Sequence, residues 1–235
     1  MEAALYLIPV TLGETPVEQV LPSYNHDVIV HIKHFIVENI RSARRFLKSV
    51  EKSIDIDTLT FYELNEHTDT RHIDHLLDPL ANGEAMGVIS EAGCPAVADP
   101  GAAAVALAHK KNLPVVPLVG PSSIIMAMMA SGCNGQSFAF NGYLPVKPNE
   151  RAGKLRQLEN RAYKENQTQI FIEAPYRNAK MIDSILATCR ADTTLCIAAG
   201  ITTAAEFIKT KQIGQWKKSK LPDLAKIPAI FLLYK

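Results

Sequence analysis

The sequence predicts two α/β domains, each built around a mainly parallel or mixed sheet. Short apolar runs alternate with helical patterns through the first half of the chain, which is the order expected of a parallel sheet with helices on both faces. Two of these runs, at 86–89 and 113–119, end in loops of small residues that precede helical segments. Because ligands bind at the carboxyl ends of parallel strands, we expect a site where these two loops meet.

Length and composition fit this fold class. A chain of 235 residues can form one large domain or two of ordinary size, and 47% hydrophobic with 21% charged residues is typical of a soluble globular protein. The longest apolar runs are too short to span a bilayer, and the first residues lack the pattern of a signal peptide. The four cysteines form no Cys-x-x-Cys pair, as in reduced intracellular proteins. We therefore expect a cytoplasmic protein with no membrane partner.

The first domain is expected to span 1–118. Apolar runs predict its strands, and amphipathic patterns predict its helices, one of which stops before Gly83 because an Asn-Gly pair favours a turn. The strands are expected at 4–9, 28–33, 59–64, 86–89 and 115–119, and the helices at 36–50, at 69–80 and after Gly101.

The second domain is expected to span 119–235, beginning with the helix that follows Ser122. Pro175 comes directly after an apolar strand and suits the first turn of the next helix. Helices are expected at 124–130, 155–164 and 178–188, and strands at 138–141, 169–172, 194–198, 206–210 and 229–234. A polar, basic stretch at 147–154 is expected as a loop.

Several segments carry a more specific pattern. They are SEAGCP at 90–95, ADPG at 98–101, VVPLVGPS at 115–122, NGYLP at 141–145, FIEAPYR at 171–177 and ENIR at 38–41. Together they resemble the tetrapyrrole-methylase-like family of S-adenosylmethionine (SAM) methyltransferases. Within it, they are most similar to the branch that methylates the 2′-oxygen of a cytidine in small-subunit ribosomal RNA. The resemblance covers nearly the whole chain.

The resemblance implies a SAM cleft between the two domains. The residues expected to bind the cofactor are Pro9, Ser90, Gly93, Cys94, Val97, Ser122, Ser123, Glu173 and Gly200. Small residues on two loops leave room for SAM and offer backbone groups to it. No metal is expected, because SAM methyl transfer needs none. His67, His72 and His75, with Asp69 and Asp74, lack the pattern of a fourth ligand.

The candidate catalytic residues are Glu38, Arg41, Lys147, Glu173 and Arg177. A ribose hydroxyl must lose its proton as the new bond forms, so a Glu or Lys is needed to accept it and an Arg to orient the reactants. Glu173 and Arg177 stand at the end of an apolar strand, where they suit either a ligand site or a helix cap. The sequence does not rank the candidates.

Basic residues supply the expected RNA contacts. Glu38, Arg41, Arg44, Arg45 and Lys48 are spaced to share one face of the helix at 36–50. Further basic groups are Lys147, Arg151, Lys154 and Arg156, and the cluster that begins at Trp216. Lys and Arg of this kind bind RNA phosphates, although they can also form a solvated face.

Three functions therefore stay open. The first is a SAM-dependent ribose 2′-O-methyltransferase acting on ribosomal RNA. The second is a SAM methylase of a small molecule or a protein, because the family's Arg-Glu pair is replaced here by Ala-Gly-Ile-Thr-Thr at 199–203. The third is a relative that binds SAM or RNA without turnover. The resemblance also implies a homodimer, to which the Met-rich helix at 124–130 could contribute.

Overall fold

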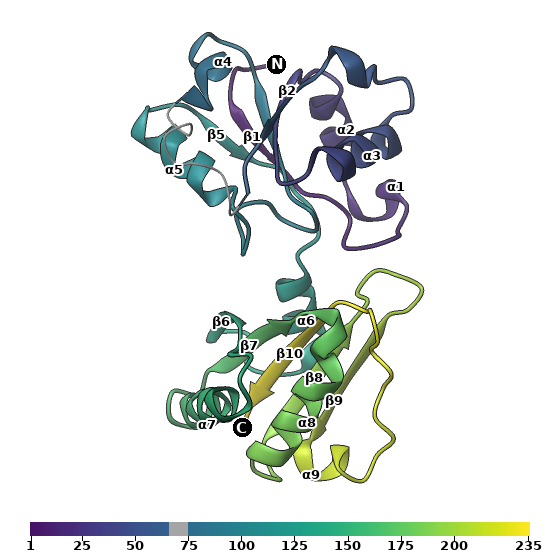
Figure 1. The fold of residues 1–235 in the computed structure, drawn as a ribbon, viewed down its shortest axis with the longest axis vertical. Coiled ribbons are helices and arrows are strands. Elements are labelled where there is room, and N and C mark those ends of the chain that lie inside the picture. The colour runs from purple at the N-terminus through teal and green to yellow at the C-terminus, as the bar shows by residue number, and fades with distance from the viewer. Residues whose placement is uncertain (66–74) are drawn as a thin grey trace. The chain divides into compact units, whose positions relative to one another are not determined.

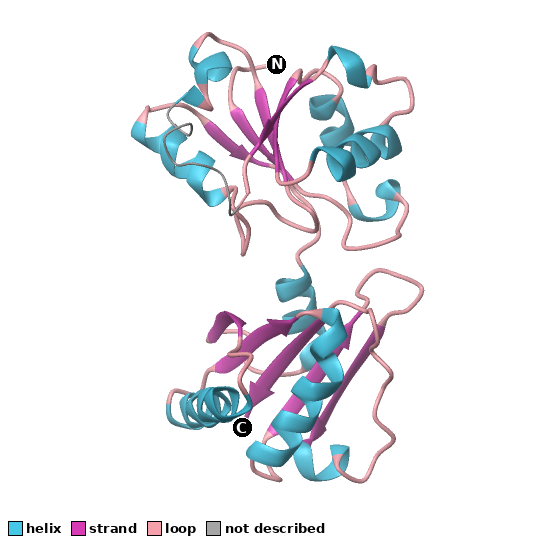
Figure 2. Ribbon diagram, in the orientation of Figure 1, coloured by secondary structure: helices cyan, strands magenta, loops and turns pink. Residues whose placement is uncertain are grey.

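The computed structural model describes residues 1–65 and 75–235. The chain divides into two compact units, Met1–Ser122 and Ser123–Lys235, and each has its own sheet with helices packed on it (Figures 1 and 2). The predicted α/β fold class is confirmed. The sequence predicts the boundary after residue 118, and in the structure it falls a few residues later, after Ser122, in the same connecting segment.

The first unit is a parallel sheet with strand order β3-β2-β4-β1-β5. Its strands are β1 (Leu5–Ile8), β2 (His34–Val37), β3 (Thr60–Glu63), β4 (Met86–Ile89) and β5 (Val115–Pro117). Its helices are α1 (Val17–Val20), α2 (Ser23–Ile29), α3 (Ile40–Val50), α4 (Asp78–Ala81) and α5 (Ala102–Lys110), with a 3-10 turn η1 (Ile56–Thr58). The part of the helix expected at 69–80 that covers 69–74 lies outside the described residues.

Two hydrophobic layers enclose this sheet. On one face, Ile8 and Phe35 pack with Phe46 of α3, and Figure 1 shows α2 and α3 on that side. On the other face, Leu5 and Met86 pack with the side chains of α4 and α5. Alternate residues of β1 enter opposite layers because side chains alternate along a strand. Because the strands are parallel and paired in register, their carboxyl ends lie at the same edge of the sheet.

The strand predicted at 28–33 is wrong. Residues 23–29 form α2, and the strand is β2, which begins at His34. Val28, Ile29 and Ile32 are all buried, at the i, i+1 and i+4 spacing of a helix and its terminal turn. A short apolar run of this kind fits a buried helix end as well as a strand, and packing against the sheet decides between them.

The helix α3 starts later than the sequence predicts. Asn39 caps it, since its side chain accepts hydrogen bonds from the backbone N–H groups of Arg41 and Ser42 at 2.9 and 3.2 Å. The strand β2 occupies most of the residues before the cap. Glu38 therefore does not lie on the helical face with Arg41, as predicted, but in the short link at the carboxyl end of β2.

The second unit is a mixed sheet with strand order β6-β7-β10-β8-β9, in which β6 and β7 are parallel and the other pairs are antiparallel. Its strands are β6 (Phe138–Tyr143), β7 (Thr168–Glu173), β8 (Thr194–Ala199), β9 (Phe207–Gln212) and β10 (Ala229–Tyr234). Its helices are α6 (Ser123–Ser131), α7 (Pro148–Lys164), α8 (Asn178–Thr188) and α9 (Ile213–Trp216), with a 3-10 turn η3 (Pro175–Arg177).

The basic stretch at 147–154 is helical, not a loop as predicted. Lys147 precedes α7, and Pro148 occupies its first turn, where the missing N–H costs nothing. Arg151 points into the protein: it is 6% exposed and donates to Ser184 Oγ at 2.9 Å and to the carbonyl of Val146 at 3.0 Å. The prediction that Arg151 meets an RNA phosphate is therefore wrong, because its donors hold the start of α7 in place.

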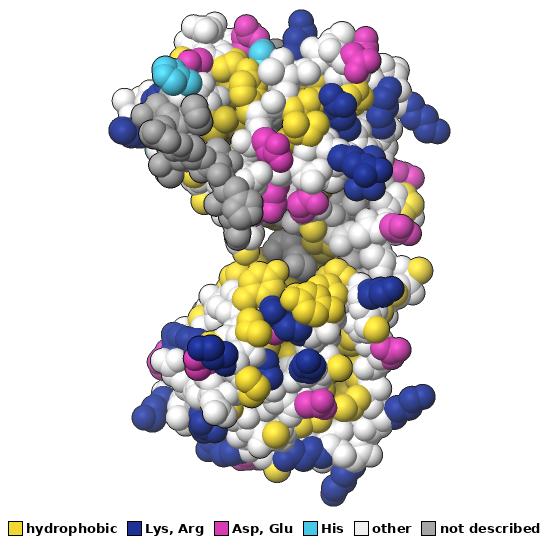
Figure 3. All heavy atoms as spheres, viewed as in Figure 1, with side chains coloured by type: hydrophobic (Ala, Val, Ile, Leu, Met, Phe, Trp, Pro, Cys, Tyr) yellow, Lys and Arg dark blue, Asp and Glu magenta, His cyan; other side chains and the backbone are white. Residues whose placement is uncertain are grey.

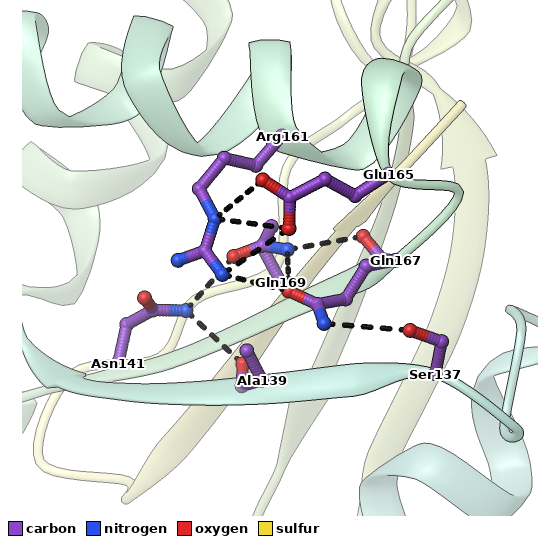
Figure 4. Close-up of polar contacts among 7 residues, drawn as sticks. All are labelled: Ser137, Ala139, Asn141, Arg161, Glu165, Gln167 and Gln169. Carbon is purple, nitrogen blue, oxygen red and sulfur yellow. Dashed lines mark hydrogen bonds and ion pairs between the residues drawn. The ribbon is translucent and has the colours of Figure 1, made fainter.

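A polar cluster ties α7 to the edge of the second sheet (Figure 4). Gln169 of β7 is fully buried, and its Nε2 donates to the backbone and side-chain oxygens of Gln167. Arg161 of α7 donates to the same Gln167 side chain at 3.0 Å and to Glu165. Asn141 of β6 donates to the Gln169 side-chain oxygen at 3.3 Å. A buried amide is tolerated here because these neighbours satisfy its hydrogen bonds.

A histidine between two carboxylates joins α2 to the end of α3. His26 Nε2 lies 3.3 Å from Glu51 and Nδ1 lies 3.4 Å from Asp27. These hydrogen bonds, to Glu51 first, raise the pKa of His26 above its usual 6.5. The pKa of Glu51 falls to about 2, mainly through hydrogen bonds from Ser53 and then through His26. The contact is therefore strongest when His26 is protonated and Glu51 is ionised.

The contact between His26 and Glu51 should give a pH-dependent stability. The His26 contribution is complete below pH 6.5 and disappears as pH rises through the raised pKa, whereas the Glu51 contribution is complete above pH 4.5 and disappears as pH falls toward 2. We expect His26→Ala to destabilise the protein most near pH 5.5 and less at pH 8 and pH 2.5, as measured by urea unfolding. His31→Ala is the matched control, because among the described residues His31 contacts a backbone carbonyl and no carboxylate. A deficit that is equal at all three pH values would contradict the assignment.

Among the residues that the structure describes, no helix combines the length and the apolar composition needed to cross a membrane.

Candidate functional site

The site in the first unit lies at the carboxyl edge of its sheet. Ile8 of β1, Ile89 of β4 and Val37 of β2 are aligned in register, so the segments that follow them leave the sheet at the same edge. Pro9 and Ser90 are the first residues beyond this edge, and both are buried. The parallel register thus brings together predicted site residues that are far apart in the sequence.

Gly93 is the point where three loops meet. Its carbonyl accepts a hydrogen bond from the backbone N–H of Val10 at 3.0 Å, which fastens the loop after β4 to the loop after β1. Its φ of +73° favours glycine. A Cβ at this position would lie 3.1 Å from Leu12 Cδ2 and 3.4 Å from the carbonyl of Pro121. Any side chain would therefore press on Leu12 in the loop after β1 and would touch Pro121 in the loop after β5.

Other predicted cofactor residues surround this point. Cys94 is half-buried and its thiol donates to the carbonyl of Pro121 at 3.4 Å, while burial raises its pKa and keeps it protonated. Gly120 packs against Pro9 so closely that a Cβ would lie 2.3 Å from that ring. Ser122 follows Pro121 directly. Val97, in contrast, is 50% exposed.

A cavity of about 400 Å³ adjoins these loops. It is lined by residues 10–15 after β1, by Ser42, Arg45, Phe46 and Ser49 of α3, and by Ser90 and Glu91 after β4. The Ser42 hydroxyl donates a short hydrogen bond to Glu91, which holds this exposed carboxylate against α3. Glu91 and Ser42 are not among the site residues predicted from the sequence. The one sequence signal for them is the position of Glu91 in the loop directly after a buried strand.

The cationic face of α3 is formed by Arg41, Arg44, Arg45 and Lys48, all of which are exposed. Figure 3 shows Lys and Arg side chains gathered over this part of the first unit. Arg44 lies over the ring of Phe61 at 5.4 Å, and Lys48 donates to a backbone carbonyl. The predicted stripe of cations is present, without Glu38.

The second unit brings Glu173, Arg177 and Gly200 to one edge of its sheet. Ala229 of β10 pairs with both Glu173 and Ala199, so Gly200 leaves the sheet level with the end of β7. The Glu173 side chain is fully buried, and its Oε1 accepts hydrogen bonds from the backbone N–H of Ala174 at 2.7 Å and from Arg177 Nε at 2.8 Å. The ion pair with Glu173 raises the pKa of Arg177, which stays charged.

Further features of this edge suit a ligand. Arg177 lies over the exposed ring of Tyr176 at 5.2 Å, and Tyr143 at the end of β6 is 62% exposed. Glu173 Oε2 is buried and has no hydrogen-bond partner among the residues that the structure describes. Gly200 adopts a φ of +58°, and a Cβ there would lie 2.8 Å from the carbonyl of Ala205, so only glycine fits this turn.

Two further predicted site residues of the second unit are Lys147 and Ser123. The Lys147 ammonium is 80% exposed and pairs with Glu150 at 3.1 Å, across the first turn of α7. Ser123 is the first residue of α6. No hydrogen bond or ion pair among the described residues joins Lys147 to the Glu173–Arg177 pair, so its role stays a prediction.

The described residues contain no group of three or more His, Cys, Asp and Glu side chains that could hold a metal ion. His67, His72, Asp69 and Asp74 lie outside the described residues. His75 is exposed and pairs with Asp78 at 3.0 Å.

Comparison with known proteins agrees with this fold. No protein-family model matches the sequence. The ribosomal RNA small subunit methyltransferase I of Vibrio cholerae is 30% identical over 213 residues, which cover 90% of this chain and 69% of that protein. The structure of the methyltransferase CobJ matches with a TM-score of 0.64 and 14% identity, over 99% of this chain and 94% of that one. A uroporphyrin-III C-methyltransferase from Thermus thermophilus, solved with S-adenosyl homocysteine, matches with a TM-score of 0.54 and 16% identity, over 99% and 97%.

Fold and sequence similarity together define the class: this protein is an SAM-dependent methyltransferase with the tetrapyrrole-methylase fold. More particularly, the chain belongs to the family of ribosomal RNA small subunit methyltransferase I. The resemblance predicted from the sequence motifs is confirmed.

Proposed function

We propose that this protein transfers the methyl group of SAM to a ribose 2′-hydroxyl of small-subunit ribosomal RNA. The relative from Vibrio cholerae, whose name states that it methylates this RNA, supports the choice of substrate. The structural observation that carries the proposal is the exposed cationic face of α3, next to the loops where the cofactor is expected. Such a face suits a polyanion better than a small acceptor molecule.

Methyl transfer from a sulfonium is an in-line displacement, so most of its acceleration comes from alignment of the two reactants. We propose that SAM contacts the loops around Gly93 and Gly120, where backbone groups are close and side chains are small. Arg41 would orient RNA on α3. Glu173 and Arg177 would act as a pair that positions a ligand at the edge of the second sheet, while the roles of Glu38 and Lys147 stay predictions.

One assay separates the proposed function from its rivals. The protein is incubated with methyl-labelled SAM and, in separate reactions, with the ribosomal RNA, the tetrapyrroles or the proteins of cells that lack it, and the labelled product is identified. A labelled 2′-O-methyl ribose supports the proposal. A label that appears only in a tetrapyrrole or in a protein would replace it with the second alternative, and SAM binding without any methyl transfer would favour the third.

Removal of the α3 arginines should weaken RNA binding. We expect the triple change of Arg41, Arg44 and Arg45 to Ala to lower the affinity for RNA at least 10-fold and to reduce the slope of log K against log salt by about one unit for each lost phosphate contact. SAM affinity should stay within twofold. Wild-type RNA affinity in this variant, measured by filter binding across salt concentrations, would show that the arginines are only a solvated surface.

We also propose that the protein is a cytoplasmic homodimer. Ile125 and Met129 of α6 are 46% and 79% exposed, and exposed apolar side chains on one helix suit a subunit interface. Light scattering should then give twice the chain mass of 25.8 kDa.

A further inference from the structure

We propose that the cavity beside α3 is the pocket for the methyl-accepting nucleoside, with Glu91 as the group that takes the proton of its hydroxyl. This inference rests on the proposed RNA methylation and deepens it. The volume of about 400 Å³ lies within the ~300–1,000 Å³ of small-molecule sites, so the cavity is large enough for one nucleoside. None of the residues predicted to be catalytic lines it.

The lining indicates what the pocket would hold. Thr11, Thr15, Ser49 and Ser90 bring hydroxyl groups, and Phe46 brings an apolar surface. The lining holds two acidic residues, Glu14 and Glu91, and one basic residue, Arg45. A bare phosphate would be repelled by this balance, whereas a sugar or base can donate hydrogen bonds to the carboxylates. The neutral part of a nucleotide therefore suits the interior, and a flanking phosphate suits Arg45.

Arg45 connects the pocket to the proposed RNA surface. It belongs to the cationic face of α3, it is exposed, and it makes no ion pair or hydrogen bond among the described residues, so its guanidinium is available to a ligand. An RNA strand bound along α3 would thus reach the cavity at Arg45. The acceptor fits better here than SAM does, because Ser90 is the only predicted cofactor residue in the described lining.

Glu91 has the geometry of a proton acceptor. Ser42 holds its carboxylate with a short hydrogen bond, and the group stays exposed to the pocket. It stands two positions before Gly93, where the cofactor loops meet. In the reaction, the 2′-oxygen attacks the methyl carbon of SAM and the carbon–sulfur bond breaks with its electron pair going to sulfur. This step gives S-adenosylhomocysteine, and the hydroxyl proton passes to the Glu91 carboxylate. Glu173, by contrast, is buried and bound to Arg177.

Two variants and two controls test this pocket. Glu91→Gln should lower kcat on RNA by about 10²–10⁴-fold and leave the Kd for SAM within twofold, because only the proton acceptor is lost. Arg45→Ala should raise the KM for RNA about 10-fold with little change in kcat. Glu63→Gln removes a carboxylate at the end of β3, at the same edge of the sheet, and Lys110→Ala removes a cation from the end of α5. Both controls should keep wild-type kinetics.

The outcomes separate this inference from the proposed function. Full turnover in Glu91→Gln would overturn the role of Glu91, and a loss of SAM affinity in that variant would make the cavity a cofactor site. If the wild type methylates no RNA, the proposed function fails, and an NMR titration with cytidine 5′-monophosphate tests the pocket by itself. Shifts of the Gly13, Ser42 and Glu91 amides that disappear in Arg45→Ala would support the pocket, and their absence in the wild type would refute it.

Discussion

Replacing Gly93 with valine should abolish SAM binding while the protein stays folded. The Cβ of any residue here lies 3.1 Å from Leu12 Cδ2, and the two methyl groups of valine extend from it into the space between the three loops. A β-branched residue at a φ of +73° also strains the backbone by about 1–3 kcal/mol. Since the free energy of unfolding of a domain is about 5–15 kcal/mol, this strain alone leaves most molecules folded. We expect a Kd for SAM at least 100-fold above the wild-type value by calorimetry.

The matched control is Gly83→Val. Gly83 has a φ of +89°, and no atom lies within 4 Å of the position its Cβ would occupy. This variant therefore carries the backbone strain without the steric pressure, so it should melt no lower than Gly93→Val and bind SAM normally. Equal SAM affinity in the two variants would show that the cofactor does not bind at the loop around Gly93.

The sequence predicts the bounds of a helix or strand correctly where its local hydrophobic pattern agrees with the burial of the element in the fold. The strands at 86–89 and 229–234 and the helix at 178–188 have the bounds that the sequence predicts. Prediction failed at 28–33, because three apolar residues fit a buried helix end as well as a strand. It also failed at Arg151, because a basic residue in a polar stretch carries no sign of the Ser184 hydroxyl that accepts from it.

The site was predictable to the extent that it is local. Glu173 and Arg177 are four positions apart, so one turn of chain brings them together, and the sequence predicts that both belong to one site. Glu91 and Ser42 are separated by 49 positions, since Glu91 lies in the loop after β4 and Ser42 lies in α3. Only the parallel register of β2 and β4 makes them neighbours, and a single sequence shows no sign of that contact.

Loss of Arg177 should have the largest effect on stability. The Glu173 side chain is fully buried, and Arg177 is the cation that neutralises it. Arg177→Met keeps most of the apolar stem but leaves a buried carboxylate without its partner. We expect the free energy of unfolding to fall by about 3–5 kcal/mol at pH 7, as measured by urea unfolding. Glu173→Gln should cost less, because its amide oxygen can still accept from Ala174 and the charge left unpaired, that of Arg177, is partly exposed to solvent.

A double variant tests whether the buried charge causes this loss. The double variant Glu173→Gln, Arg177→Met should recover most of the loss at pH 7, because no unpaired carboxylate is then left buried. If it is no more stable at pH 7 than Arg177→Met alone, the deficit comes from the lost packing of Arg177 over Tyr176, and the buried charge is not its cause.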